Sequence, residues 1–208
     1  MKISEKMSLQ TLVKISNITN LSDARYCAGM GVEMLGFSMD SLSVQKFNEI
    51  KGWVAGVQIV GETESDNLQV VTELVQQYAP DYLQISQLSL LDGIGVLGLP
   101  VLLNLDFATQ TEAELQTIME RTKGQVAYYL LENSDEFARI ETDTLDVLNR
   151  LTFHFPVLVG FGITELNCKE ILKELTPTGI ALTGGDEIRP GYKDFGEMMG
   201  ILEALEEE

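Results

Sequence analysis

Short apolar runs typical of β-strands alternate along the chain with longer segments in which apolar residues recur every three or four positions. Strand character is found in eight runs: 12–16, 33–38, 53–60, 82–86, 101–105, 126–132, a run from 157 into Gly160, and 179–183. Helical spacing follows in 23–30, 43–50, 64–78, 87–97, 111–122, 134–151, a run from Thr164 through Leu172, and 195–205. This alternation predicts parallel strands joined by crossover helices.

Eight consecutive strand–helix units predict an α/β fold, a (β/α)8 TIM barrel of parallel strands. An open, doubly wound sheet is the alternative with the same alternation. No linker or low-complexity segment interrupts the pattern, so we expect a single barrel domain over residues 1–208. The least regular segment is 87–97, where a short or irregular helix is expected.

Polar residues at the ends of the apolar runs predict where the helices begin. Asn20 or Ser22 can cap the first helix, Ser43 opens the second, and Ser134 and Thr164 precede the sixth and seventh. The run 53–60 is almost continuously apolar, as expected for a strand of a sheet that is buried on both faces.

Composition places the chain among ordinary globular proteins, with 208 residues and 45% hydrophobic residues. The polar start of the chain carries no apolar signal-peptide core, and no run reaches the length of a membrane span, so a cytoplasmic protein is expected. Cys27 and Cys168 lie far apart, and His154 is the only histidine. These residues suggest neither a disulfide framework nor a metal site, and no cofactor is predicted.

Charge restricts the partners. With 14 basic and 32 acidic side chains, the formal net charge is −18. Such a charge repels nucleic acid and anionic membranes, so neither is expected as a partner. An anionic ligand would have to be held by backbone N–H groups or helix dipoles against this field. The oligomeric state is left open by the sequence.

Two glycine-rich turns follow the last two strand-type runs. Their residues are Gly160, Phe161, Gly162 and Ile163 after the seventh run, and Thr183, Gly184 and Gly185 after the eighth. A strand, a glycine-rich turn and a helix together collect N–H groups around a phosphate, and in barrels this site is built after strands 7 and 8. The turns therefore predict a small phosphorylated metabolite as ligand. Ordinary strand–helix turns, in which glycine is common, are the alternative.

Polar residues also end most of the strand-type runs, and active sites of barrels lie at these carboxyl ends. The strand-end residues of the predicted ring are Ser16, Ser38, Gln58, Gln84, Ser86, Asn104, Asp106 and Glu132, followed by Gly160 and Thr183 at the last two runs. Side chains alternate along a strand, so Gln84 shares a face with Ser86, and Asn104 with Asp106. Lys14 lies deeper in the first run. It is expected to pair with a carboxylate, with a Schiff-base lysine as the other possibility.

Several stretches resemble the phosphoribosylanthranilate isomerase family. The run Val13-Lys-Ile-Ser-Asn-Ile-Thr-Asn-Leu-Ser-Asp-Ala24 is similar to its opening V-K-I-C-G-I-T-N-x-x-D-A, and Met34-Leu-Gly-Phe37 to its A-x-G-F. Gly160-Phe-Gly-Ile-Thr-Glu-Leu-Asn167 resembles S-G-G-L-x-P-x-N. Ala181-Leu-Thr-Gly-Gly-Asp-Glu187 with Pro190-Gly-Tyr-Lys-Asp194 resembles D-V-S-S-G-V-E followed by P-G-x-K-D. The likeness runs in register from about residue 12 to 205.

The resemblance implies a barrel, a phosphoribosyl-type ligand and an Amadori rearrangement in tryptophan biosynthesis. Ser16 stands where the family has the cysteine that acts as general base, and Glu132 where it has the aspartate that acts as general acid. Asn17 replaces a glycine, Ser86 a histidine and Ala181 an aspartate. Residues 38–43 contain no arginine and residues 133–143 no G-G-[ST]-G loop, although the family has both.

Two functions are compatible with these residues. In the first, the chain is an isomerase with Glu132 as acid and Ser16 as base, assisted by Asp106, the nearest carboxylate by strand order; Gln84, Ser86 and Asn104 would line the substrate pocket. In the second, it is a non-catalytic barrel that binds a phosphorylated metabolite or a protein partner. Fold analogy alone does not choose between them.

Overall fold

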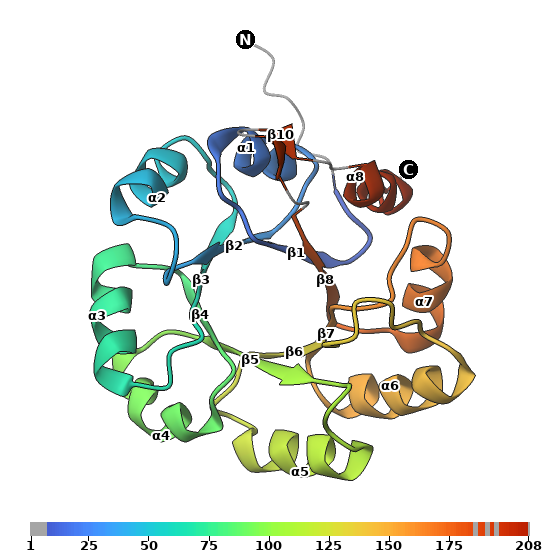
Figure 1. Ribbon diagram of the computed structural model, residues 1–208. Helices are drawn as coiled ribbons and strands as arrows, with labels where there is room; N and C mark the ends of the chain where they lie inside the picture. The colour runs from blue at the N-terminus through green and yellow to red at the C-terminus, as the bar shows by residue number, and fades with distance from the viewer. Residues whose placement is uncertain (1–7, 185–186, 190–191, 194–195, 208) are drawn as a thin grey trace.

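The computed structural model describes residues 8–184, 187–189, 192–193 and 196–207. Eight parallel strands close into a barrel in chain order, with β1 paired to both β2 and β8. The crossover helices form a ring outside the strands (Figure 1). The predicted (β/α)8 barrel is therefore confirmed, and the open-sheet alternative is wrong.

The strands are short, as in most barrels. Their bounds are β1 Leu12–Ser16, β2 Met34–Ser38, β3 Gln58–Glu62, β4 Tyr82–Ile85, β5 Val101–Asp106, β6 Tyr128–Glu132, β7 Val157–Val159 and β8 Gly179–Thr183. The helices are α1 Leu21–Gly29, α2 Val44–Lys51, α3 Leu68–Tyr78, α4 Leu91–Ile94, α5 Glu112–Thr122, α6 Thr142–His154, α7 Cys168–Leu175 and α8 Gly196–Ala204. As expected, the segment before β5 is irregular, because two 3-10 turns flank the single turn of α4.

Capping explains where several helices begin. The side chain of Asn20 accepts a hydrogen bond from the backbone of Asp23, and that of Ser43 from Lys46. Thr111 and Glu114 form a reciprocal capping box at the start of α5. Each side chain satisfies a backbone N–H that has no partner inside the helix.

The third strand lies later in the chain than the apolar pattern predicts. Helix α2 ends at Lys51, Trp53 is 72% exposed, and Gly56 has a positive φ of 76°. A left-handed glycine turns the chain, so the strand begins only at Gln58 and ends at Glu62. Gln58, expected at the carboxyl end of the strand, therefore starts it, and Glu62 takes the terminal position.

The sixth helix also begins later than predicted. Asn133 accepts a hydrogen bond from the backbone N–H of Asp135, and Asp135 accepts one from Phe137. These Asx turns compete with helical hydrogen bonding, so the chain stays irregular until Thr142. Ser134 does not cap α6, because its own backbone N–H donates to Asp106 across the strand ends.

A small hairpin follows the last barrel strand. Strands β9 (Glu187–Arg189) and β10 (Tyr192–Lys193) pair antiparallel as a separate two-stranded sheet. The sequence pattern does not predict this hairpin, because neither strand is long enough to show an alternation of apolar and polar positions.

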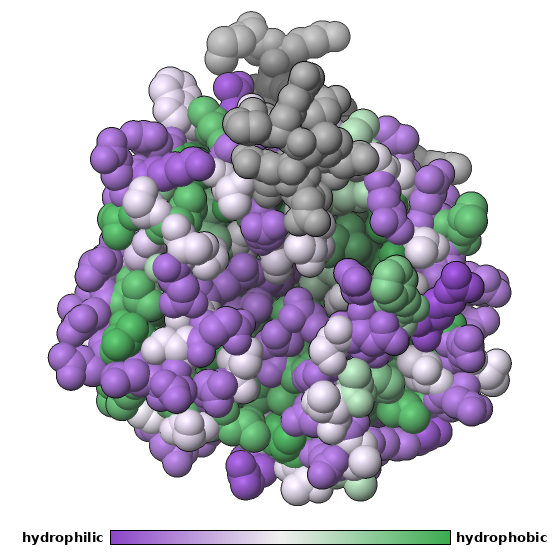
Figure 2. Space-filling model, viewed as in Figure 1, coloured by the Kyte–Doolittle hydropathy of each residue, from purple (hydrophilic) through white to green (hydrophobic). Residues whose placement is uncertain are grey.

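The barrel interior is apolar in the middle and polar at one end. A layer inside the barrel combines one buried side chain from each of six strands: Met34, Val60, Leu102, Leu130, Leu158 and Ala181. Lys14 (0% exposed) and Gln84 (6%) lie buried among the barrel strands. Hydrophilic residues dominate the face in Figure 2, with apolar ones scattered between them. Among the described residues, no helix has both the length and the apolar character needed to span a bilayer.

Candidate functional site

The carboxyl ends of the parallel strands bring together side chains that are far apart in the chain. Ser16 ends β1, Glu62 ends β3 and Glu132 ends β6. The strand register aligns Ser38 with Glu62, Glu62 with Gln84, and Asp106 with Glu132. The predicted ring of polar strand ends is therefore formed, with Glu62 in place of Gln58.

A hydrogen-bonded cluster links β1 to β3. The Lys14 ammonium lies 2.5 Å from Oε1 of Glu62 and 2.5 Å from Oγ of Ser16. The Ser16 hydroxyl donates to the same Glu62 oxygen at 2.8 Å. The expected pairing of Lys14 with a carboxylate is confirmed. Because Lys14 is fully buried, this pairing keeps its charge compensated inside the barrel.

Glu62 fits into the mouth because the neighbouring strand carries a glycine there. A Cβ atom on Gly36 of β2 would lie 2.0 Å from Oε1 of Glu62. Any other residue at this position would push the carboxylate away from Lys14. The glycine of the Met34-Leu-Gly-Phe37 motif therefore has a direct role in shaping the mouth.

Glu132 lies in a different environment at the same end of the barrel. Its Oε2 accepts a hydrogen bond from Nδ2 of Asn104 at 2.7 Å. A Cβ on Gly160, which directly follows β7, would lie 3.1 Å from its Cγ, so this side chain also lies over a glycine. Burial raises the pKa of Glu132; the Asn104 hydrogen bond and the charge of Lys14 oppose the rise, and Glu62 and Glu64 add to it.

Asp106 has a local structural role that the sequence analysis did not anticipate. Its Oδ1 accepts hydrogen bonds from the backbone of Ala108 and Ser134, both at 3.0 Å, and its Oδ2 accepts one from Thr109. Burial raises the pKa of this carboxyl, but these hydrogen bonds outweigh burial and lower it. The carboxylate beside Ser16 is Glu62, so the expectation that Asp106 is nearest to Ser16 is wrong. Strand order pointed to Asp106 because the third strand was predicted at 53–60, a range that leaves out Glu62.

Three residues were expected to line a substrate pocket. Gln84 lies on β4, Ser86 directly follows β4, and Asn104 lies on β5. Ser86 donates to Oε2 of Glu64 at 3.1 Å, and Asn104 donates to Glu132. Ser86 and Asn104 both line a small pocket beside Asp106. Gln84 is more deeply buried, one strand away from Glu62.

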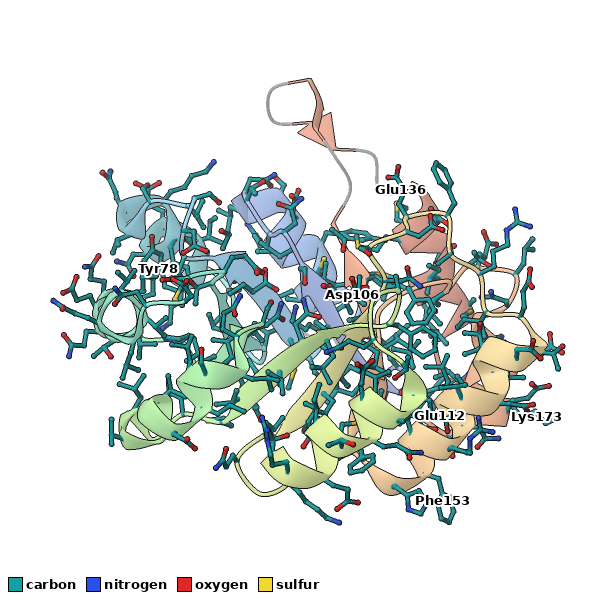
Figure 3. The ribbon with its side chains drawn as sticks, turned by 60° about the horizontal axis from the view of Figure 1, so that its bottom comes forward. Tyr78, Asp106, Glu112, Glu136, Phe153 and Lys173 are labelled. Carbon is teal, nitrogen blue, oxygen red and sulfur yellow. The ribbon has the colours of Figure 1, made fainter. Side chains whose placement is uncertain are left out.

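A larger cleft of about 960 Å³ opens at the ends of β7 and β8. Five of the predicted phosphate-binding residues line it: Gly160, Phe161, Gly162, Ile163 and Thr183. Its other walls come from the loop between β6 and α6, from the turn before α7, and from α8. Gly184 does not line the cleft, and Gly185 lies outside the described residues. In Figure 3, Asp106 at the end of β5 and Glu136 in the β6–α6 loop lie toward one end of the barrel, and Phe153 lies toward the other end.

Only part of the predicted set of N–H donors is available. The N–H of Gly160 donates to Leu131 and that of Gly184 donates to Ser16, both within the strand ladder. Neither can also face a phosphate, because each extends the hydrogen bonding of its strand by one residue. Within the described part of the chain, the N–H groups of Gly162 and Ile163 have no protein acceptor.

The turn after β7 is bridged by one side chain. The Asn167 side chain accepts from the Thr164 backbone at 2.7 Å and donates to the Gly162 carbonyl at 2.8 Å. Gly162 has a positive φ of 66°, and a Cβ there would lie 2.9 Å from Ile140 of the β6–α6 loop, so the position has no room for a side chain. Asn167 thus holds both sides of the turn that carries the unpaired N–H groups.

The charges around the cleft oppose an anion. Asp135, Glu136, Glu141 and Glu197 line it, and Arg139 is the only basic residue among the described lining residues. Backbone N–H groups would therefore have to hold a phosphate against a local excess of negative charge. No cluster of three or more His, Cys, Asp or Glu side chains that could hold a metal occurs among the described residues.

Comparison with known proteins confirms the resemblance predicted from the motifs. The N-(5'-phosphoribosyl)anthranilate isomerase of Natronomonas pharaonis is 26% identical over 93% of this chain and 97% of its own length. The crystal structure of phosphoribosyl anthranilate isomerase from Thermotoga maritima superposes with a TM-score of 0.77 at 17% identity, covering 94% of this chain and 98% of its own.

A crystal structure of such an isomerase in complex with reduced 1-(o-carboxyphenylamino)-1-deoxyribulose 5-phosphate gives a TM-score of 0.71 at 18% identity, over 94% and 98% of the two chains. No family model matches the chain. The chain thus resembles these isomerases over nearly its whole length and shares their barrel.

One departure from the family motif lies at a left-handed backbone position. Asn17, which replaces the glycine of the opening motif, has a positive φ of 59°. Asparagine tolerates this conformation better than most residues, so it can stand where the motif has glycine. The departures at Ser16 and Glu132 are different in kind, because they change the groups that would carry protons.

Sequence reasoning missed Glu62, the residue that completes the β1–β3 cluster. A signal was present, because a lysine inside a barrel strand requires a buried carboxylate partner. The sequence places an acidic residue directly after the apolar Ile59-Val60-Gly61, but the strand was assigned to 53–60 and ended too early to include it.

Proposed function

We propose that this chain is a phosphoribosylanthranilate isomerase-like barrel that binds a phosphorylated, phosphoribosyl-type small molecule in the cleft at the ends of β7 and β8. In this proposal, isomerase activity toward phosphoribosylanthranilate is slow at best. Glu132 acts as the proton donor, and Ser16 acts as the proton acceptor with Glu62 behind it. Phosphate binding draws on the N–H groups of the turn after β7, with Thr183 at the end of β8 lining the same cleft, and Gln84, Ser86 and Asn104 face the rest of the ligand.

The observation that carries the proposal is the pair of unpaired N–H groups at Gly162 and Ile163. Both residues line the 960 Å³ cleft, in a turn held by the Asn167 side chain. Preorganised N–H groups of this kind bind phosphate without a basic side chain. The relative bound to a ribulose 5-phosphate derivative supports the choice of a phosphorylated ligand.

The proton-transfer groups support slow chemistry at best. A serine hydroxyl is a poor base, so Ser16 would have to pass its proton to Glu62. The Oε1 atom of Glu62 that would take this proton is already bound by the Lys14 ammonium at 2.5 Å. Glu132 is better suited to its role, because burial raises its pKa and favours the protonated form.

The electrostatics of the mouth also disfavour the substrate of the relatives. The ligand named for the related crystal structure carries a carboxyphenyl group as well as a phosphate. The arginine that the family has after its second strand is missing here, and Glu62, Glu64 and Glu132 surround the mouth. This supports the alternative function, a non-catalytic barrel that binds a phosphorylated metabolite or a protein partner.

Phosphate binding can be tested at the two N–H groups directly. Titration with inorganic phosphate at constant ionic strength, followed by ¹H–¹⁵N NMR, should shift the amides of Gly162 and Ile163 saturably. The amide of Gly124, another glycine with positive φ, precedes β6 at the far end of the barrel and should not move. If the Gly162 and Ile163 signals stay in place under saturating phosphate, the proposed site is wrong.

Removing acidic side chains from the cleft tests whether their charge weakens phosphate binding. Glu136→Gln and Glu197→Gln each remove a negative charge from the lining of the cleft. Each should tighten phosphate binding about 2–3-fold, because a unit charge ~8 Å away in water contributes about 0.5 kcal/mol. Glu120→Gln, an exposed residue of α5, is the matched control and should leave the affinity unchanged.

Turnover distinguishes a slow isomerase from an ordinary one. Loss of a positioned acid or base typically costs ~10²–10⁴-fold, so turnover of phosphoribosylanthranilate should lie at least ~10³-fold below the typical ~10 s⁻¹. Substrate fluorescence measures this rate. Ser16→Cys combined with Glu132→Asp should recover only part of it, because the missing arginine is not restored.

A rate of several per second in the unmodified protein would contradict this account of Ser16. Glu62 would then be the first base to examine, through the pH–rate profile of Glu62→Gln. Total absence of turnover together with saturable phosphate binding would favour the non-catalytic function.

A further inference from the structure

The loop between β6 and α6 contributes one uncommitted cation to the cleft at the ends of β7 and β8. Arg139 lies in this loop, is exposed, and lines the cleft. The ion pairs of the described residues use Lys14, Lys123 and Arg150. Within the described part of the chain, the Arg139 guanidinium has neither an ion-pair nor a hydrogen-bond partner. It is therefore available to a ligand.

Arg139 stays unpaired although carboxylates are close to it in the chain. Asp135 and Glu136 precede it, and Glu141 follows it. The Asp135 carboxylate instead accepts a hydrogen bond from the backbone of Phe137 at 3.0 Å, which holds that carboxylate within the loop. The loop thus presents a free guanidinium to a cleft in which the other charges of the described lining residues are negative.

The chain on both sides of Arg139 lies against the turn that carries the free N–H groups. A Cβ atom on Gly162 would lie 3.1 Å from the backbone nitrogen of Ile140 and 3.4 Å from the carbonyl oxygen of Ala138. Ala138 and Ile140 flank Arg139 in the sequence. The backbone that carries Arg139 therefore lies directly beside Gly162, and both residues line the same cleft.

Two backbone N–H groups do not use all the acceptors of a phosphate monoester. Such a group has three free oxygens and carries close to two negative charges at neutral pH. The guanidinium of arginine is a planar fork whose paired N–H donors match two phosphate oxygens. A phosphate diester has fewer free oxygens and a single charge, so it gains less from a guanidinium placed beside the two N–H groups.

We propose that Arg139 completes the phosphate site and makes it selective for a phosphate monoester over a diester. This inference rests on the proposed phosphate site at Gly162 and Ile163. The Arg139 guanidinium binds two oxygens of the phosphate, and its charge offsets the repulsion from the carboxylates of the cleft. The class of ligand that fits is a small metabolite with a terminal phosphate group.

Titrations with methyl phosphate and dimethyl phosphate measure this selectivity. At about pH 7 the monoester is largely a dianion. The amides of Gly162 and Ile163, followed by ¹H–¹⁵N NMR at constant ionic strength, report the binding of either probe. Methyl phosphate should bind about tenfold or more tightly than dimethyl phosphate, because it engages the guanidinium fully. Equal affinities for the two probes would overturn the inference.

Replacing the arginine tests its role directly. Arg139→Gln should weaken methyl phosphate binding about tenfold, the low end for charge-assisted hydrogen bonds, because the site is exposed. Dimethyl phosphate should lose less, so the difference between the probes should narrow. Arg121→Gln makes the same charge change at an exposed position of α5 and is the matched control. Equal methyl phosphate affinity in these two variants would overturn the inference.

Arg139→Lys separates the guanidinium fork from its charge. Lysine keeps the positive charge but offers a point charge in place of the fork, so the affinity for methyl phosphate should lie between those of the unmodified protein and Arg139→Gln. Full affinity in Arg139→Lys would overturn the bidentate contact. Because Arg139 is exposed, both substitutions should leave the amide spectrum outside the cleft unchanged.

The same titrations distinguish a failure of this inference from a failure of the proposed function. Saturable shifts at Gly162 and Ile163 with unchanged affinity in Arg139→Gln would leave the phosphate site in place and overturn only the role of Arg139. If the unmodified protein shows no saturable shift with methyl phosphate, the phosphate site itself is wrong, and the role of Arg139 is overturned with it.

Discussion

Glu62 and Glu132 end two strands of the same barrel, and each lies over a glycine, Gly36 in β2 or Gly160 directly after β7. Their surroundings differ. Glu62 is held by the Lys14 ammonium and the Ser16 hydroxyl, whereas the hydrogen-bond donor to Glu132 among the described residues is the neutral amide of Asn104, and the Lys14 charge acts on it without a hydrogen bond. The β1–β3 sector is thus electrostatically compensated, and the β5–β6 sector is not.

This difference shows how one residue type can serve two purposes at one site. A carboxylate that is paired with a buried cation keeps its charge and fixes the geometry around it. A carboxyl that is buried without a hydrogen-bonded cation has a raised pKa, so it can keep a proton or bind a cation. The first sector gives structural rigidity, and the second carries the candidate acid.

The largest effect on the difference between the two sectors is expected when Lys14 is replaced. Lys14→Met leaves Glu62 in the mouth without its cation, and removal of one partner of a buried ion pair typically costs about 3–5 kcal/mol. We expect a loss of unfolding free energy of that size in urea denaturation. Glu62 is 14% exposed, so water relieves part of the penalty and the lower end of the range is expected.

Two further variants control this experiment. Lys46→Met, at an exposed position of α2, should change the unfolding free energy by less than about 0.5 kcal/mol. The double variant Lys14→Met with Glu62→Leu should recover most of the loss, because it leaves no uncompensated charge. A loss below about 1 kcal/mol in Lys14→Met alone would show that the β1–β3 sector is not held by this pair.

A smaller effect of opposite sign is expected at Glu132. The raised pKa of Glu132 means that the folded protein binds its proton more tightly than the unfolded chain does. Stability therefore falls as pH rises from the unfolded pKa of about 4.3 through the folded pKa. Glu132→Gln removes this term, so the variant should match the unmodified protein near pH 4 and exceed its stability near pH 8.

The difference should be about 1 kcal/mol, the usual scale of a point substitution, measured by urea denaturation at both pH values. Glu62→Gln is the matched change in the other sector and should be destabilising at pH 8, because it leaves the Lys14 ammonium without its carboxylate. If both substitutions shift stability in the same direction, the two sectors are not electrostatically distinct.

The sequence alone determined the architecture and part of the capping. Eight alternations of apolar runs predicted the barrel, and Asn20 and Ser43 cap α1 and α2 because short polar side chains satisfy free N–H groups there. The predicted cap at Thr164 is wrong, because α7 begins only at Cys168 and the backbone N–H of Thr164 donates to the Asn167 side chain. The motifs around Ser16 and Gly162 were sufficient to recognise the resemblance to the isomerases. The alternation also predicted that Ser16 and Glu132 lie at the same end of the barrel, since parallel strands share their direction.

Only the tertiary structure decided which of these polar ends contact one another. Periodicity placed the third strand too early, because the apolar residues 53–57 belong to a turn whose glycine has a positive φ, and this hid Glu62. Whether an N–H is free or used also depends on a strand far away in the chain, as Gly184 shows by donating to Ser16. Contacts between distant segments decide which carboxylate pairs with Lys14, and they set the pKa of Glu132. They also leave oxygens of Gln84, Asn104 and Gln110 unpaired among the described residues. A local pattern along the chain predicts that Lys14 needs a carboxylate partner, but not which one.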